Sequence, residues 1–336
     1  MATILITGGT GLIGKALTKA LLEKDYNVII LTRGGKTSVN NLQSTSMIGY
    51  ALWNVGEQTI DQDAITKADY IIHLAGAGVA EKRWTKKRKQ EIVSSRVDSG
   101  KLITDSLRNI PNNVKAVVTA SAIGWYGQSP LSSGEGRGEV FEETDPPAED
   151  FLGQTCKQWE ESIEPIIQLG KRLVKLRTGI VLSPEGGALK EFLKPLRYGI
   201  AAVLGGGRQI ISWIHIDDLV RLYITAIENE NMTGAYNAVA PGPVSNREFT
   251  LQLARIKRGR FFIPAYVPSF LLRLLLGEMS IEVLKSATIS CDKIHCEGFV
   301  FQFPSLESAL KNLLEKNPSP EEEVQRTPSK GRGRRL

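Results

Sequence analysis

A glycine-rich turn near the N-terminus constrains the fold of this chain more than any other feature. Gly8, Gly11 and Gly14 follow the short strand-forming run Thr3–Thr7, and Leu12–Lys24 then has helical periodicity. Glycines at this spacing let the chain turn sharply out of a strand, let a phosphate approach the backbone, and let the helix pack closely on the sheet. Free N–H groups at the helix start attract anions. The turn therefore predicts a dinucleotide-binding βαβ unit; a tight turn without ligand is the alternative.

The end of the second strand indicates which dinucleotide binds. The run Asn27–Thr32 ends at Thr32-Arg33, with no carboxylate nearby in the sequence. NAD sites usually carry an acidic residue here, which binds the ribose hydroxyls, whereas an arginine suits a 2′-phosphate. The sequence therefore predicts NADP(H), and a surface arginine at a strand end is the alternative. The expected contacts are Gly8, Thr10, Gly11, Leu12, Ile13, Gly14, Thr32 and Arg33.

Strand-forming runs alternate with helical segments over the first two thirds of the chain. Continuous apolar strands separated by helices indicate a parallel sheet that is covered on both faces. The fold class is therefore α/β, a Rossmann-type doubly wound parallel sheet with a smaller, mostly helical C-terminal region on the substrate side. The further runs are Asp69–Leu74, Val114–Thr119, Lys171–Arg177, Gly179–Leu182 and Ser212–Ile216.

The pattern changes after about residue 242. We expect an NADP-binding domain over residues 1–242, with substrate-loop elements at about 183–215, a small helical domain over 243–316, and a disordered tail over 317–336 rich in Pro, Ser, Glu and Arg. The helical segments expected in the C-terminal domain are Glu248–Ile256, Ser269–Leu276, Ile281–Ser286 and Ser305–Leu314.

Composition excludes several classes of protein. The 336 residues are 42% hydrophobic and 23% charged, and no apolar run is long enough to span a bilayer. The chain shows no signal peptide, and Cys156, Cys291 and Cys296 lack metal-ligand spacing, so we expect a cytoplasmic protein with no metal site and no membrane partner. The net charge of +6 suits a phosphate-bearing ligand and does not by itself indicate nucleic acid.

Several motifs resemble those of extended short-chain dehydrogenases/reductases. They are Thr7–Gly14 (TGGTGLIG), His73–Gly76 (HLAG), Ser121–Gly127 (SAIGWYG) and Trp213–Asp218 (WIHIDD). Arg83-Trp84, Ser95-Arg96, Trp159-Glu160, Arg177–Gly179 and Gly298-Phe299 with Phe301 resemble an atypical branch, the epimerase family, which has a small C-terminal helical domain. The resemblance covers about residues 2–314 and implies a nucleoside-diphosphate-sugar epimerase-like protein.

Further cofactor contacts follow from a helical stripe and from the resemblance. Ile92, Arg96, Ile103 and Leu107 share one stripe, and an arginine on an apolar stripe needs an anionic or hydrogen-bonding partner. The resemblance implies that Glu91 and Arg96 contact NADP, that Leu74 and Ala75 lie beside it, and that Val181 lies near the nicotinamide. A structural Glu91–Arg96 pair is the alternative.

The expected catalytic groups depart from the superfamily pattern. Ser121 and Tyr126 follow the strand Val114–Thr119, so they are candidates at the carboxyl edge of the sheet. Typical superfamily enzymes also use a Tyr-x-x-x-Lys pair, in which the lysine lowers the tyrosine pKa. Alignment on Glu160 puts those two positions on Leu152 and Cys156, and neither side chain can replace the pair.

The substrate and the partners are less constrained. Arg208, Trp213 and His215 are candidate substrate contacts; for His215, packing beside a helix cap at Asp217 is the alternative. Three functions remain open: an NADP-dependent oxidoreductase or epimerase that uses other groups such as Ser121, Tyr126 or His215, a non-catalytic NADP(H) sensor or regulator, and a nucleic-acid-associated protein with a basic tail, which is the weakest. A small-molecule substrate is expected. The resemblance implies a homodimer formed through Lys89–Leu107 and Cys156–Gln168, but the charge on the first segment argues against it, so the oligomeric state stays open.

Overall fold

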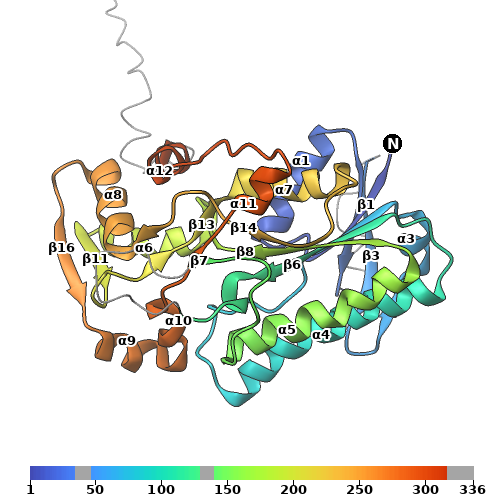
Figure 1. Ribbon diagram of the computed structural model, residues 1–336, viewed down its shortest axis with the longest axis horizontal. Helices are drawn as coiled ribbons and strands as arrows, with labels where there is room; N and C mark the ends of the chain where they lie inside the picture. The colour runs from blue at the N-terminus through green and yellow to red at the C-terminus, as the bar shows by residue number, and fades with distance from the viewer. Residues whose placement is uncertain (35–46, 129–139, 316–336) are drawn as a thin grey trace, which may run out of the picture.

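A mostly parallel sheet of eight strands forms the centre of the molecule (Figure 1). The computed structural model describes residues 1–34, 47–128 and 140–315. The strand order is β14-β8-β6-β5-β1-β2-β3-β4, and neighbours are parallel except for β3 and β4. The strands are β1 (Thr3–Thr7), β2 (Asn27–Thr32), β3 (Ile48–Asn54), β4 (Thr59–Ile60), β5 (Tyr70–His73), β6 (Ala116–Ala122), β8 (Arg172–Thr178) and β14 (Gly234–Ala238).

Helices cover both faces of this sheet, which confirms the predicted α/β class. Successive side chains of β1 enter different cores: Ile4 and Ile6 pack in the core that includes Leu17, whereas Leu5 packs in the core that includes Ile103. The first core lies under α1 (Leu12–Glu23) and α7 (Ile216–Glu228). The second lies under α3 (Gln62–Lys67), α4 (Lys86–Asn109) and α5 (Phe151–Ile163).

Nine short strands of the described residues form smaller sheets, and six of them pair across residue 242. The nine are β7 (Val140–Phe141), β9 (Ile180–Ser183), β10 (Gly186–Gly187), β11 (Ile200–Leu204), β12 (Ile210–Ile211), β13 (Trp213–His215), β15 (Val244–Ser245), β16 (Ile263–Val267) and β17 (Thr288–Ile289). β11 pairs with β16, β12 with β15, and β7 with β17. Backbone hydrogen bonds therefore join the region that we predict as a C-terminal domain to the chain before it.

The remaining helices belong mainly to the C-terminal region, which is mostly helical as predicted. They are α6 (Ala188–Leu196), α8 (Asn246–Arg258), α9 (Ser269–Leu276), α10 (Ser280–Leu284), α11 (Asp292–Cys296) and α12 (Leu306–Glu315). α8 begins with a capping box between Ser245 and Glu248. Within the described residues, we find no helix with both the length and the apolar character needed to cross a lipid bilayer. The tail predicted over 317–336 lies outside the described residues.

Asp218 fastens the C-terminal segment to α7. Its fully buried carboxylate accepts hydrogen bonds from Gln302 N at 2.8 Å and from Phe303 N at 2.9 Å. It also accepts one from Arg221 Nη1 at 2.9 Å. One side chain therefore satisfies two backbone donors that are far away in the sequence, which is a demanding role for a buried charge.

We predict that Asp218→Ala lowers the free energy of unfolding by about 3 kcal/mol, because it leaves those donors without their acceptor. Urea unfolding followed by circular dichroism measures the change. The control is Asp217→Ala, whose side chain is 38% exposed and whose loss is expected to cost roughly 1 kcal/mol or less. Equal effects of the two substitutions would contradict this role.

Candidate functional site

The glycine turn leaves the N-terminus of α1 open to an anion. Gly8 has φ +70°, a conformation that favours glycine. Gly11 is the N-cap of α1, no side chain caps the helix, and its first turn holds no acidic residue. A Cβ at Gly14 would lie 2.4 Å from Gly8 O, so only glycine lets the helix start this close to the turn. These features meet the steric and electrostatic needs of a bound pyrophosphate.

The turn lies directly against the loop that follows β5. A Cβ at Gly8 would lie 3.0 Å from the carbonyl carbon of Leu74 and 3.1 Å from Ala75 N. On the other side, the β9–β10 hairpin approaches Leu12, because a Cβ at Gly187 would lie 3.4 Å from Val181 O and 3.6 Å from Leu12 Cδ2. The predicted cofactor residues Leu12, Leu74, Ala75 and Val181 are thus gathered around one turn.

A buried chain of hydrogen bonds joins the turn to the β5 loop. Thr7 Oγ1 accepts from Leu74 N and Ala75 N, both at 3.1 Å, so its own proton points to His73 Nδ1 at 2.7 Å. We therefore assign the proton of His73 to Nε2, which donates to Ser99 Oγ at 3.2 Å. Sequence analysis missed this chain, because no spacing shows that Thr7 and His73 end adjacent strands.

Burial keeps His73 neutral. The ring is fully buried, and desolvation lowers the pKa of His73 to about 4. A protonated ring would also place a proton on Nδ1, where the Thr7 hydroxyl now donates. The two loops therefore depend on an imidazole that stays uncharged near neutral pH.

Arg96 and Glu91 do not form the pair that was the alternative in the sequence analysis. Arg96 is buried, donates to the carbonyl oxygens of Ala77 at 3.0 Å and Ile92 at 2.9 Å, and stacks on Trp159 with 4.8 Å from its guanidinium carbon to the ring centre. Glu91 is exposed and pairs with Arg88 at 2.8 Å. Carbonyl groups thus supply the hydrogen-bonding partner that the apolar stripe required. Contact of either residue with NADP stays a prediction.

Arg33 is exposed at the end of β2, next to Thr32, whose Oγ1 accepts from Gly34 N at 3.3 Å. A cavity of about 670 Å³ extends from the glycine turn along α1, and two lysines contribute to its wall. Its lining residues are Gly9, Thr10, Lys15, Thr18, Lys19, Leu22, Glu23, Ile30, Ile48 and Tyr50. Lys19 lies 3.9 Å from Glu23, which is also in the wall, so Lys15 is the lysine left to attract a phosphate-bearing ligand here.

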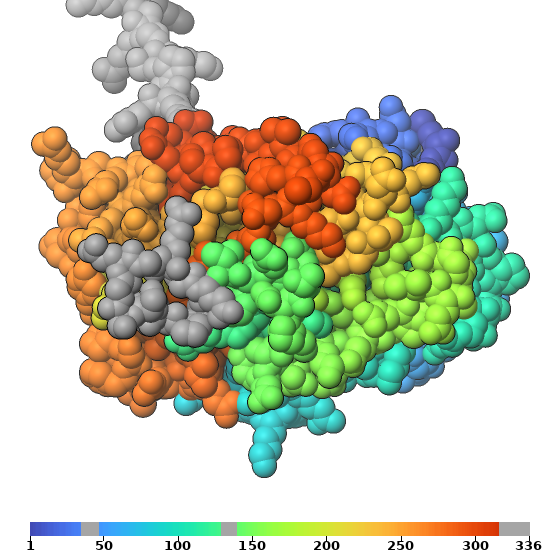
Figure 2. Space-filling view, viewed as in Figure 1, coloured from blue at the N-terminus to red at the C-terminus, as the bar shows by residue number. Residues whose placement is uncertain are grey.

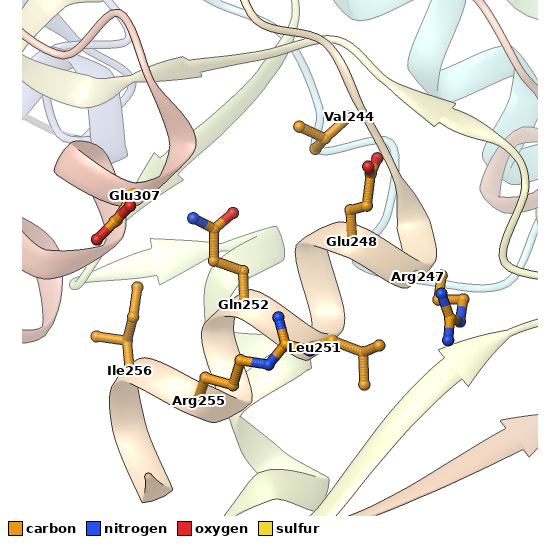
Figure 3. A pocket seen from close by; sticks show the side chains of 8 residues that line it. All are labelled: Val244, Arg247, Glu248, Leu251, Gln252, Arg255, Ile256 and Glu307. Atoms are coloured by element: carbon orange, nitrogen blue, oxygen red, sulfur yellow. The ribbon is translucent and has the colours of Figure 1, made fainter.

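Another cavity, of about 490 Å³, lies between α8 and α12 (Figure 3). In Figure 3, Gln252 of α8 extends into the space that separates it from Glu307 of α12. Its lining residues are Val244, Arg247, Glu248, Leu251, Gln252, Arg255, Ile256 and Glu307. Since none of them is a predicted site residue, we do not assign the candidate site to this cavity.

Ser121 and Tyr126 lie in a buried polar cluster rather than on an open surface. Ser121 Oγ donates to Glu160 Oε1 at 2.7 Å, and Tyr126 OH donates to Asn237 Oδ1 at 2.6 Å. Arg177 connects them, because its Nε donates to Glu160 at 2.9 Å and its Nη1 donates to Tyr126 OH at 3.0 Å. Both hydroxyls are occupied and inaccessible, so this geometry does not support the prediction that they are catalytic.

The ionisation of this cluster fits a structural role. Burial raises the pKa of Tyr126 to about 12. Burial alone would also raise the pKa of Glu160, but hydrogen bonds and attraction from Arg177 hold that pKa below its ordinary value. The cluster is therefore a carboxylate–guanidinium pair with a protonated phenol near neutral pH, and it joins β6, β8, β14 and α5.

Leu152 and Cys156 face the turn that follows β6. A Cβ at Gly124 would lie 3.2 Å from Leu152 Cβ and 3.7 Å from Cys156 Sγ. Cys156 Sγ donates to Ala122 O at 3.6 Å, and burial raises the pKa of the thiol to about 12. A protonated thiol and a leucine thus lie where the alignment expects the Tyr–Lys pair. Neither side chain can act as a base there.

Trp213 and His215 are fully buried, which does not support their predicted contact with a substrate. Trp213 Nε1 donates to Gly242 O at 2.8 Å. His215 caps α7 by accepting from Asp217 N at 3.0 Å and stacks on Phe303 at 3.9 Å between ring centres. The packing alternative therefore describes His215, but the cap of α7 is His215 itself and not Asp217, which lies in the first turn of the helix. Arg208, by contrast, is exposed on the loop between β11 and β12.

Two ion pairs that the sequence analysis missed hold the C-terminal helices on the main domain. Lys89 of α4 pairs with Glu278, and Lys285 pairs with Asp150, the N-cap of α5, at 2.7 Å. These pairs bring the two ends of α10, with Glu278 before it and Lys285 after it, to the N-terminal ends of α4 and α5. Hydropathy patterns carry no signal for such long-range pairs.

Comparison with known proteins connects the chain to one family. Residues 4–239 match the NAD dependent epimerase/dehydratase family, and residues 267–313 match a domain of unknown function, DUF1731. An epimerase family protein of Staphylococcus saprophyticus is 37% identical over 314 residues, which cover 94% of this chain and 100% of the relative. One from Staphylococcus aureus MRSA252 is 36% identical over 318 residues, with 94% and 100% covered.

Solved structures agree with this similarity. The human epimerase family protein SDR39U1, solved with NADPH, superposes with a TM-score of 0.79 at 27% identity and covers 93% of this chain and 99% of its own. The nucleoside-diphosphate sugar epimerase from Corynebacterium glutamicum has a TM-score of 0.70 at 27% identity, with 96% of this chain and 64% of that chain covered.

We predict that acid destabilises the protein partly through His73. The pKa of His73 is about 6.5 in the unfolded chain and about 4 in the folded protein. The stabilisation from the neutral ring is thus complete above pH 6.5 and is lost as the pH falls toward 4, with a loss of about 2 kcal/mol between pH 7 and pH 5. Urea unfolding at both pH values measures it.

The matched comparison is His73→Asn, which keeps an acceptor for Thr7 but does not titrate. The difference between pH 7 and pH 5 is expected to be about 2 kcal/mol smaller in this variant. If the two proteins lose equal stability between pH 7 and pH 5, His73 is not the neutral connector described above.

Proposed function

Because the chain belongs to the NAD dependent epimerase/dehydratase family, we propose that it binds NADP(H) and acts as an oxidoreductase or a nucleotide-sugar epimerase-like protein on a small molecule. The observation that best supports cofactor binding is the open N-terminus of α1, which Thr7 and His73 hold beside the β5 loop. The free, mostly buried cysteines fit a reducing cytoplasm. A dimer through α4 and α5 is part of this proposal.

The choice of NADP(H) over NAD(H) rests on two observations. Arg33 is exposed where an NAD-binding protein usually has an acidic residue. The human relative SDR39U1 was solved with NADPH. A guanidinium binds a 2′-phosphate through charge-assisted hydrogen bonds, whereas a carboxylate would repel it.

The residues around the turn fit the parts of the dinucleotide. The backbone of Gly8–Gly14 would hold the pyrophosphate against the start of α1, while Leu74 and Ala75 line the adjoining loop. Val181, on the hairpin that contacts Leu12, would face the nicotinamide. The bound nicotinamide supplies a hydride donor or acceptor. Buried hydrogen bonds fix both loops, so the protein orients the cofactor without rearranging them.

The expected positions offer little support for the proton transfer that an enzymatic function would need. Leu152 and Cys156 face the turn after β6, and burial holds the pKa of the Cys156 thiol at about 12. Ser121 and Tyr126 are occupied in the buried cluster. A catalytic cycle would need a proton donor outside these four side chains. These observations favour a second candidate function, a non-catalytic NADP(H)-binding sensor or regulator.

We predict that the protein binds NADPH at least roughly tenfold more tightly than NADH, since one charge-assisted contact contributes about 1.5–3 kcal/mol. Arg33→Asp is expected to remove the difference by weakening NADPH binding. Isothermal titration calorimetry measures both affinities. Arg108→Asp, at the exposed end of α4, is the control and should bind as the wild type does. Equal affinities for NADPH and NADH in the wild type would end the NADP assignment.

Turnover separates the two candidate functions. The protein is mixed with NADPH and a panel of aldehydes, ketones and nucleotide sugars, and the absorbance of the reduced nicotinamide is followed, with chromatography for redox-neutral epimerisation. We expect turnover of at least one substrate class, retained in Cys156→Ala because the buried thiol transfers no proton. Tight NADPH binding without turnover across the panel would favour the sensor.

A further inference from the structure

A basic stretch without acidic residues runs from the middle of α8 to the end of α9. Between Glu248 and Glu278 the sequence contains no Asp or Glu. It contains five basic residues, Arg255, Lys257, Arg258, Arg260 and Arg273. Surface segments of folded proteins usually mix both signs of charge, so a one-sign segment marks an electrostatic preference for an anionic partner.

This stretch, together with residues 198–200 and Ile281, carries most of the exposed large hydrophobic side chains of the described residues. The described residues expose thirteen of them, and nine lie at positions 198–200 or 261–281. Phe261 is 85% exposed and Tyr198 is 84% exposed. The nine are Tyr198, Ile200, Phe261, Ile263, Tyr266, Phe270, Leu274, Leu275 and Ile281. Single exposed apolar residues are ordinary, but a concentration of this kind marks a contact surface.

Pairing between β11 and β16 brings the first of these side chains together. Ile200 lies opposite Ile263 in the parallel ladder. Since opposed residues point to the same face, both lie on the outer face, while the next residue of β11, Ala201, points into the core. Tyr198 and Phe261 precede the two strands and flank this pair.

Arginines surround this apolar group. The backbone of Phe261 donates to Arg258 O at 3.1 Å, and the guanidinium of Arg258 lies 3.5 Å from where a Cβ of Gly199 would be. Arg197 and Arg260 are exposed beside Tyr198 and Phe261 in the sequence. We call this surface the basic tip and define it as Arg197, Tyr198, Ile200, Arg258, Arg260, Phe261 and Ile263. A nearby acidic residue on α6, Glu191, is paired with Lys194 at 2.6 Å.

α9 extends the apolar surface along the same end of the molecule. The helix follows β16 after Pro268, and its exposed Phe270 and Leu274 are one turn apart on one side, with Arg273 beside them. Figure 1 shows β16 and α9 at one end of the molecule, and Figure 2 shows orange atoms at the same end. The apolar and basic residues therefore share one end, away from the glycine turn.

We propose that this end of the molecule docks on an anionic lipid surface, with the basic tip and α9 inserted into the headgroup region. Aromatic and aliphatic side chains beside arginines are the combination that holds peripheral proteins at such an interface. The mode of binding is peripheral and adds a location to the proposed cofactor-binding function. It departs from the sequence-based expectation of no membrane partner, which considered only spanning segments.

Two other occupants suit the surface less well. A second copy of the chain, packed face to face, would bring arginines of the same sign together without an acid to pair them. Single-stranded nucleic acid uses aromatic side chains for stacking, but Ile200, Ile263, Leu274 and Leu275 offer no ring for a base. Aliphatic chains of a lipid match these side chains.

Vesicle co-sedimentation of the full chain tests the proposal. The vesicles contain phosphatidylcholine alone or with 30% phosphatidylglycerol, at roughly physiological ionic strength. We expect binding to the anionic vesicles and at least roughly tenfold weaker binding to the neutral ones. Phe261→Ser with Ile263→Ser should weaken binding to the anionic vesicles roughly tenfold or more, and so should Arg258→Glu with Arg260→Glu.

Matched controls separate this surface from general charge and hydrophobicity. Lys86→Glu with Lys87→Glu makes the same charge change on α4, and Val300→Ser removes another exposed apolar side chain. Both controls should bind anionic vesicles as the wild type does, and NADPH affinity should be unchanged in every variant. Wild-type binding by the tip variants would overturn the proposal, since another segment, such as the basic C-terminus, would then be responsible.

The proposal is also overturned if the protein does not bind anionic vesicles, or if it binds neutral vesicles equally well. It is overturned as well if the tip variants leave vesicle binding unchanged and alter only the sedimentation coefficient of the protein, because the surface would then bind a second copy of the chain. RNA binding that the tip variants abolish while vesicle binding persists would also overturn the proposal.

Discussion

The hydrogen bond between Thr7 and His73 is the interaction on which the candidate site depends. It connects the ends of β1 and β5, and the same threonine oxygen accepts from Leu74 N and Ala75 N. The glycine turn can therefore pack so closely on the β5 loop that a Cβ at Gly8 would lie 3.0 Å from Leu74 C, while both amides keep an acceptor. Leu74 N also donates to Thr7 O at 3.2 Å, so Ala75 N is the amide that depends on the hydroxyl. The arrangement requires an uncharged imidazole, and complete burial of His73 supplies that condition. In the proposed function, two side chains that need not touch the cofactor thus set the geometry of its site.

The buried cluster around Arg177 shows how superfamily positions can have a structural use. One guanidinium, that of Arg177, donates to both Glu160 and Tyr126, and Ser121 donates to the same Glu160 carboxylate. The guanidinium also lies 3.7 Å from the Trp125 ring centre. Removal of one member of the ion pair would leave a buried charge unpaired. The cluster therefore stabilises one arrangement of the strands and offers no free group for catalysis. Binding and chemistry are therefore separable here. The turn and its hydrogen bonds support the proposed binding of a dinucleotide, and no equally complete arrangement supports proton transfer among the side chains named above.

The sequence predicted β1, β2 and α9 with their observed bounds because each has a continuous apolar run or a clear helical period. It missed β3, where Gly49 and half-exposed positions weaken the pattern. Ser121 was placed beyond its strand, but β6 continues to Ala122, and the ladder sets Ser121 opposite Arg177. The sequence also could not predict that Trp213 is buried or which groups Arg96 bonds to, because side-chain direction depends on register and on distant segments.

The most direct test of the account is the affinity for NADPH after Thr7→Val, which keeps the shape of the side chain and removes its hydroxyl. Thr119→Val is the control, because Thr119 is also buried. Among the described residues, its hydroxyl bonds only to Ala120 O, its neighbour in the sequence. Both variants are first shown to be folded by circular dichroism. The account predicts roughly tenfold weaker NADPH binding for Thr7→Val and wild-type binding for Thr119→Val, since a buried unsatisfied amide costs about 1–3 kcal/mol. Wild-type affinity in a folded Thr7→Val protein would contradict it.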